Sequence, residues 1–68
     1  MTPNVTEKLI ELTATGGTGT REAALYALGE GADATDEVIN VLLTAATTGG
    51  SGTREAAIKA LGRIFWHK

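Results

Sequence analysis

The sequence predicts an all-α fold in which two tandem helix-turn-helix repeats form a minimal α-α superhelix. The chain repeats itself at an offset of 33 residues, with 15 identical positions between residues 2–29 and 35–62. Apolar residues recur at helical spacing, and no segment alternates between apolar and polar residues as a half-buried strand does. We therefore expect one domain over residues 1–68, with repeat one at about 2–34 and repeat two at about 35–68.

The first helix of each repeat is expected to begin at a threonine. Thr2 and Thr35 are suitable N-caps, and Pro3 is well tolerated at the first helical position. The first helix of repeat one then carries a single apolar stripe at helical spacing, made of Val5, Leu9 and Leu12.

Glycine-rich turns are expected to end the first helices. These turns span Thr15–Gly19 and Thr48–Gly52, and they can stop a helix because their glycines tolerate positive φ angles. The second helices should then run from about Thr20 to Gly29 and from about Thr53 to Trp66. Small residues at 30–34 predict an irregular linker between the repeats, able to act as a hinge.

The second helices carry a family signature. An arginine precedes an alanine-rich segment that ends in Ala-Leu-Gly, at Arg21 with 27–29 and at Arg54 with 60–62. Here the chain resembles the short HEAT-like repeats named after phycobilisome lyases. The resemblance implies an α-α superhelix whose second helices line a concave binding face, in a family made mostly of interaction scaffolds. The chain departs from the family where glycine-rich turns replace the usual acidic-Pro entry to these helices. The period also fits ankyrin repeats, but their Thr-Pro-Leu-His signature is missing.

Composition disfavours several classes of function. Six basic and eight acidic residues give a net charge of −2, which does not provide the basic surface that binds nucleic acid. No apolar run approaches the roughly 20 residues of a membrane span, and Met1-Thr2-Pro3-Asn4 lacks the features of a signal peptide. We therefore expect a cytoplasmic protein with no nucleic-acid and no membrane partner.

Residues for catalysis or metal binding are scarce. The chain has no cysteine, and its one histidine is the penultimate residue, His67, which we expect in a solvated tail. One histidine and scattered carboxylates do not supply the three or four converging ligands of a metal site. We expect no catalytic residue, no metal and no cofactor.

The glycine-rich turns offer an alternative function. A helix N-terminus with free N–H groups and a nearby cation binds anions. The candidate residues for a phosphate or other anion are Gly17, Gly19, Arg21, Gly50, Gly52 and Arg54. The P-loop spacing is absent, however, and the resemblance implies that an arginine at this position usually bonds to helix-end carbonyls between repeats.

An outward face of the second helices is the candidate surface for an unidentified protein partner. Its residues are Glu22, Tyr26, Glu55, Lys59 and Arg63. Trp66 either extends this face as an aromatic recognition residue or folds over the end of the core as a lid.

The first helix of repeat two is apolar on most sides, whereas that of repeat one keeps a polar exterior. Two repeats are few for a continuous core, so we expect a two-fold homodimer or its domain-swapped variant. The residues of this seam are Val38, Ile39, Val41, Leu42, Ala45, Phe65 and Trp66. The net charges of the repeats, −3 and +1, favour head-to-tail stacking instead. Head-to-tail contacts, however, add further copies without limit unless they close into a ring. Apolar burial also contributes more than attraction between surface charges, so we expect the two-fold dimer.

These features predict a non-catalytic protein–protein interaction or self-assembly module. One alternative is the anion-binding module described above. The other, suggested by the resemblance, is a small tetrapyrrole lyase or chaperone-like subunit. The chain is far shorter than such enzymes and has no internal histidine.

Overall fold

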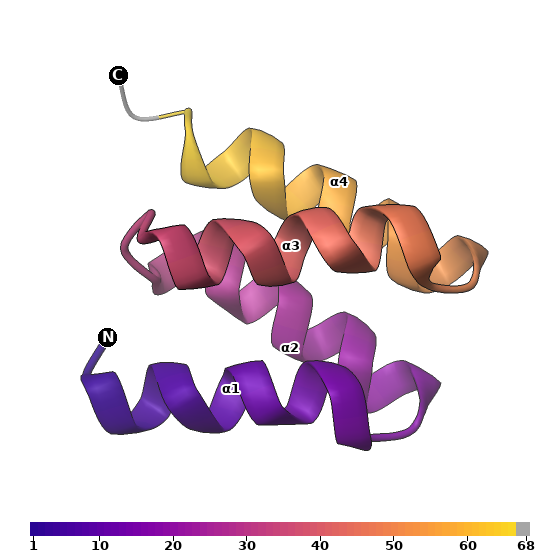
Figure 1. Cartoon of the computed structure of the whole chain (residues 1–68), viewed down its shortest axis with the longest axis horizontal. Helices are drawn as coiled ribbons and strands as arrows, with labels where there is room; N and C mark the ends of the chain where they lie inside the picture. The colour runs from indigo at the N-terminus through magenta and orange to yellow at the C-terminus, as the bar shows by residue number, and fades with distance from the viewer. Residues whose placement is uncertain (67–68) are drawn as a thin grey trace.

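Four α-helices make up the fold (Figure 1). The computed structural model of this chain describes residues 1–66, and in that range there is no strand. The helices are α1 (Pro3–Thr15), α2 (Thr18–Gly31), α3 (Asp36–Thr48) and α4 (Ser51–Ile64). The prediction of an all-α fold is confirmed, and each repeat contributes one helical hairpin.

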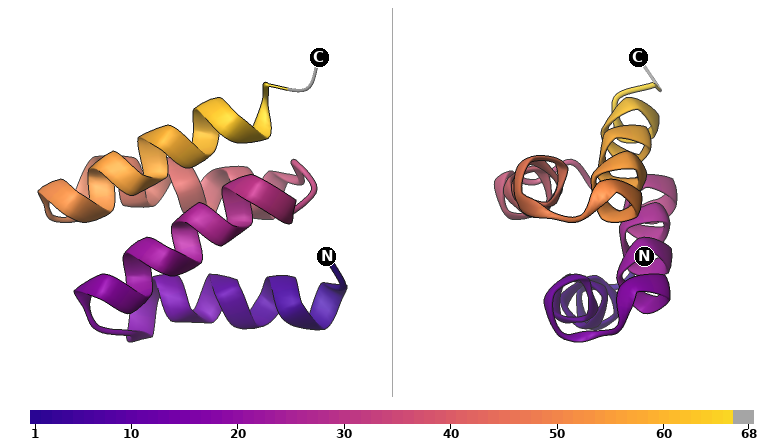
Figure 2. Two further views of the ribbon diagram at one scale, coloured as in Figure 1. Left: turned by 180° about the vertical axis from the view of Figure 1, so that it is seen from behind. Right: turned by 90° about the vertical axis from the view of Figure 1, so that its right-hand side faces the viewer.

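The helices lie in two layers. Figure 2 shows α1 and α3 in one layer and α2 and α4 in the other, with α2 and α4 running side by side in the same direction. The most extensive packing is between α2 and α4, followed by the packing within each hairpin, whereas α1 and α3 barely touch. The two hairpins are therefore joined mainly through their second helices.

Threonine caps begin α1 and α3, as the sequence predicts. The Thr2 hydroxyl oxygen accepts a hydrogen bond from the Val5 N–H at 3.3 Å, and that of Thr35 accepts one from the Val38 N–H at 3.2 Å. Each bond satisfies one of the N–H groups that a first helical turn leaves unpaired. By contrast, α2 and α4 begin at glycines with no side-chain cap.

The ends of the second helices differ from the prediction. α2 begins two residues before Thr20 and continues two residues past Gly29, so the linker is confined to residues 32–35. α4 ends at Ile64, so Trp66 lies beyond the helix instead of inside it. The early start follows from the turn, because two extended glycines reverse the chain without a longer loop.

The turn glycines do not use the left-handed region that glycine tolerates. No residue in 1–66 has a positive φ, and Gly16 and Gly17 are extended with φ of −81° and −68°. At the first position of each turn, Gly16 or Gly49, the lack of room for a Cβ explains the glycine better than its φ angle does. A Cβ on Gly16 would lie 2.5 Å from Thr20 Cγ2, and Thr53 confines Gly49 in the same way.

One hydrophobic core spans both repeats. The largest fully buried side chains are Leu25, Leu28, Leu42 and Val38. The alanines buried with them on α4 are Ala56, Ala57 and Ala60. At Gly29 the helix α2 approaches α4 so closely that a Cβ would lie 2.7 Å from Ala60 Cα. Small residues thus bring the second helices together, while α1 supplies no fully buried residue.

Candidate interaction surfaces

The residues predicted for self-association do not form one surface. Val38 and Leu42 are 1% and 0% exposed and belong to the core of a single chain, so these two assignments are corrected. The physical reason is that the second helices already cover this side of α3. The half-buried members of the predicted seam are Ile39, Val41 and Ala45. Its exposed members are Phe65 and Trp66.

The predicted partner face is exposed but partly engaged in ion pairs. Tyr26 is 43% exposed, and Glu22 is half-buried beside Gly52 at the start of α4. Lys59 Nζ lies 3.6 Å from Glu55 Oε2, with both side chains more than half exposed. An exposed pair of this kind contributes little to stability, so these charges remain available to solvent or to a partner.

An ion pair that sequence reasoning missed joins the two repeats. Arg63 Nε on α4 donates a hydrogen bond to Glu30 Oε1 on α2 at 3.2 Å. Glu30 and Arg63 are separated by the repeat offset of 33 residues, so they occupy equivalent positions in their repeats. That opposition of charge at equivalent positions is the signal in the sequence that points to this contact.

Trp66 does not fold over the core. Its side chain is 71% exposed, and Arg63 Cζ lies 5.5 Å from the centroid of its ring, within the range of a cation–π interaction. Because α4 ends at Ile64, Trp66 does not continue the helical face of Glu55 and Lys59 either, so neither alternative describes its position.

The two arginines of the glycine-rich turns have different surroundings. Arg21 Nε donates a hydrogen bond to the Gly16 carbonyl at 2.9 Å, so this cation closes the turn between α1 and α2. Arg54 is exposed, and its guanidinium has no hydrogen bond or ion pair within residues 1–66. In repeat one, the arginine of the predicted anion site is therefore already hydrogen-bonded to a backbone carbonyl.

A groove between α1 and α3 was not foreseen. It has a volume of about 790 Å³ and is lined mainly by residues of α1 and α3. Its apolar lining residues are Ile10, Ala14, Val41 and Ala45. Its polar lining includes Thr13, Thr44, Thr48, Arg21 and Thr53. The groove exists because α1 and α3 barely touch, and the residue pattern of each helix by itself does not show how far apart the two helices lie.

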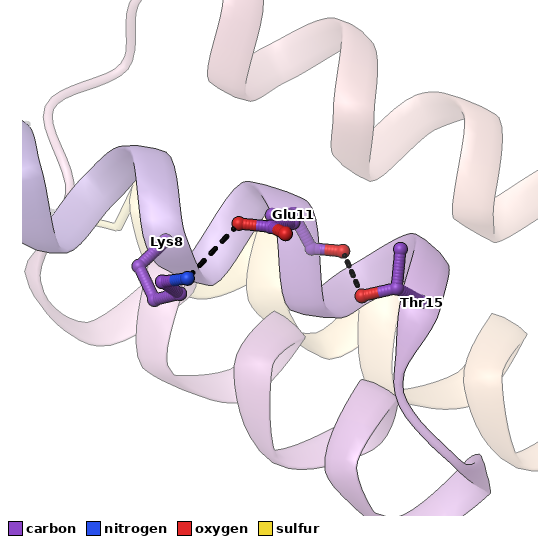
Figure 3. Close-up of polar contacts among 3 residues, drawn as sticks. All are labelled: Lys8, Glu11 and Thr15. Carbon is purple, nitrogen blue, oxygen red and sulfur yellow. Dashed lines mark hydrogen bonds and ion pairs between the residues drawn. The ribbon is translucent and has the colours of Figure 1, made fainter.

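The outward side of α1 is polar, as the sequence predicts. Lys8 Nζ lies 3.1 Å from Glu11 Oε1, and the Thr15 hydroxyl donates a hydrogen bond to the Glu11 carbonyl oxygen (Figure 3). The Lys8 and Glu11 side chains are 65% and 58% exposed, so the ion pair between them is strongly screened by water.

No protein-family model, curated protein or solved structure matches this chain. Within residues 1–66, no three side chains of the metal-binding types gather closely enough to hold an ion, and His67 lies outside the described residues. In the same range, none of the helices has both the length and the apolar character needed to cross a membrane.

Proposed function

We propose that the chain is a non-catalytic protein–protein interaction and self-association module, built from two HEAT-like repeats in an α-α superhelix. The observation that carries this proposal is a set of large apolar side chains left uncovered on both hairpins. Val5 is 48% exposed, Leu43 is 49% exposed and Ile58 is 59% exposed. Each of these side chains stays in contact with water in the single chain, and covering such apolar surface favours association.

The packing of the hairpins supports the repeat assignment. Equivalent helices α2 and α4 lie side by side in the same direction, which is the arrangement expected of neighbouring solenoid repeats (Figure 2). The bond from Arg21 to the Gly16 carbonyl gives this arginine a structural role, although the bond lies within repeat one and the resembled family implies a bond between repeats.

Sedimentation velocity of the full chain, from about 1 to 300 µM, tests the proposal in the range of ordinary protein affinities. We expect the weight-average mass to rise above that of the 7.0 kDa chain as the concentration increases. A monomer mass over the whole range would contradict self-association.

A further inference from the structure

The two repeats meet along a seam between α2 and α4. Helix α2 contributes Leu25 and Gly29 to it, and α4 contributes Ala56 and Ala60, all of them buried. The approach is closest at Gly29, where a Cβ would lie 2.7 Å from Ala60 Cα. The seam thus joins a leucine and a glycine on one helix to a row of alanines on the next.

The α2 side of this seam is repeated on the free surface of α4. At the offset of 33 residues, Leu25 corresponds to Ile58, and Gly29 corresponds to Gly62. Ile58 is 59% exposed, and a Cβ on Gly62 would meet no atom within 4 Å. We name this surface the Ile58 face and define it by Glu55, Ile58 and Gly62.

The α4 side of the seam is repeated on the free surface of α2. Ala56 and Ala60 correspond to Ala23, which is exposed, and Ala27, which is half-buried. We name this surface the Ala23 face and define it by Gly19, Ala23 and Ala27. The Ile58 face and the Ala23 face therefore carry the two halves of a contact that the chain already makes internally.

A third contact of the seam also has its two equivalent residues on the free faces. Within the chain the Glu22 carboxylate lies against Gly52 on α4. The equivalent residues are Glu55 on the Ile58 face and Gly19 on the Ala23 face, with the same identities. A copy placed on the Ile58 face thus presents a glycine to Glu55, as α4 presents one to Glu22.

Charge favours the same arrangement. The formal net charge is −3 for residues 2–34 and +1 for residues 35–68, so repeat two of one copy attracts repeat one of another. Across the internal seam, Arg63 pairs with Glu30. Because these residues occupy equivalent positions, stacking brings Arg63 of one copy toward Glu30 of the next.

The first helices do not oppose this stacking. Lys8 and Glu11 on the polar side of α1 correspond to Val41 and Thr44, which line the groove between α1 and α3. Since the first helices barely touch within the chain, Lys8 and Glu11 would line a similar water-filled groove between copies. Thr44 is exposed, so Glu11 at the equivalent position would keep its hydration. Val41 is half-buried, so the stem of Lys8 would be partly covered while its ammonium group extends to water.

We propose that a second copy of this chain covers each of these faces, so that copies stack head to tail. The Ile58 face of one copy packs on the Ala23 face of the next and reproduces the internal seam of α2 with α4. This inference rests on the proposed self-association and specifies its geometry. Unlike the two-fold dimer expected from the sequence, a head-to-tail contact leaves one face free at each end and continues into longer stacks.

A pair of complementary variants tests the geometry. Ile58→Glu blocks the Ile58 face and Ala23→Glu blocks the Ala23 face, both at exposed helical positions. Each variant alone should stay monomeric in sedimentation velocity at concentrations where the unmodified chain associates. Mixed in equal amounts, they should form a dimer and nothing larger, because each supplies the face that the other lacks. Ala34→Glu, in the exposed loop between α2 and α3, is the matched control and should associate like the unmodified chain.

Far-UV circular dichroism verifies that each variant keeps its helix content. Ile58→Lys and Ala23→Lys repeat the test with the opposite charge, and the same pattern is expected if the effect is blocking of the faces. An unmodified chain that stops at a dimer, or mixed variants that remain monomeric while the unmodified chain associates, would overturn head-to-tail stacking and leave self-association standing. A chain that stays monomeric throughout would overturn both proposals.

Discussion

Two glycines at equivalent positions have different surroundings. Gly29 lies in the seam, where a Cβ would lie 2.7 Å from the backbone Cα of Ala60. Gly62 faces open space in the single chain. Both lie inside helices, where glycine is about 1 kcal/mol less favourable than alanine. The difference between the two substitutions therefore measures the tertiary contact alone.

Alanine should have opposite effects at these glycines. Gly29→Ala should lower the free energy of unfolding by about 1–3 kcal/mol, because α2 and α4 must move apart to admit the Cβ. Gly62→Ala should raise it by up to about 1 kcal/mol through helix propensity. Urea denaturation at a concentration where the chain is monomeric measures both. Equal stability of the two variants would contradict the close approach at Gly29.

Among the elements, α1 is the least firmly held. No residue of α1 is fully buried, whereas Val38 and Leu42 anchor α3 in the core. α1 packs mainly on α2 and scarcely meets α3. Opening α1 therefore brings no fully buried residue of its own into water.

Hydrogen exchange should show that α1 opens more readily than α3. Backbone amides at residues 7–15 of α1 should exchange at least about tenfold faster than those at 40–48 of α3, because α1 opens locally while α3 opens only with the core. Mass spectrometry or NMR of the monomeric chain measures both segments. Equal protection would mean that α1 unfolds only together with the rest of the domain.

At the scale of the whole molecule, the proposed head-to-tail assembly combines charge attraction with the burial of apolar surface. The repeats differ in net charge by sign, and the ion pair between Arg63 and Glu30 crosses the seam at the surface. The Glu30 side chain is 64% exposed, so salt screens this pair efficiently. The proposed contact of Ile58 with the alanines of a second copy is apolar and would not be weakened by such screening.

Association should therefore weaken with salt without being abolished. Raising sodium chloride from about 0.05 to 0.5 M should reduce the association constant about two- to fivefold, the effect expected of exposed pairs. Sedimentation velocity at both salt concentrations measures the change. Glu30→Gln removes one partner of the ion pair and should reduce the salt dependence. Association that strengthens with salt in the unmodified chain would contradict a contribution from charge attraction.

Much of the secondary structure was predictable because its causes are local. The threonine caps at Thr2 and Thr35, the helical spacing of the apolar residues and the breaks at glycine act within a few residues of one another. The repeat offset further predicted that each hairpin would have a counterpart. The expected helix ends were off by about two residues, because the turn needed only two extended glycines.

By itself the sequence determined that this chain forms two helical hairpins. The tertiary structure decided which side chains are buried and which polar side chains form hydrogen bonds. Arg21 and Arg54 have nearly identical neighbours in sequence, yet only Arg21 is engaged with the backbone of its turn. Val38 is buried while its equivalent Val5 is exposed, because only Val38 faces another repeat. The local sequence pattern predicts which side of a helix is apolar, but the packing of the hairpins decides whether another helix covers that side.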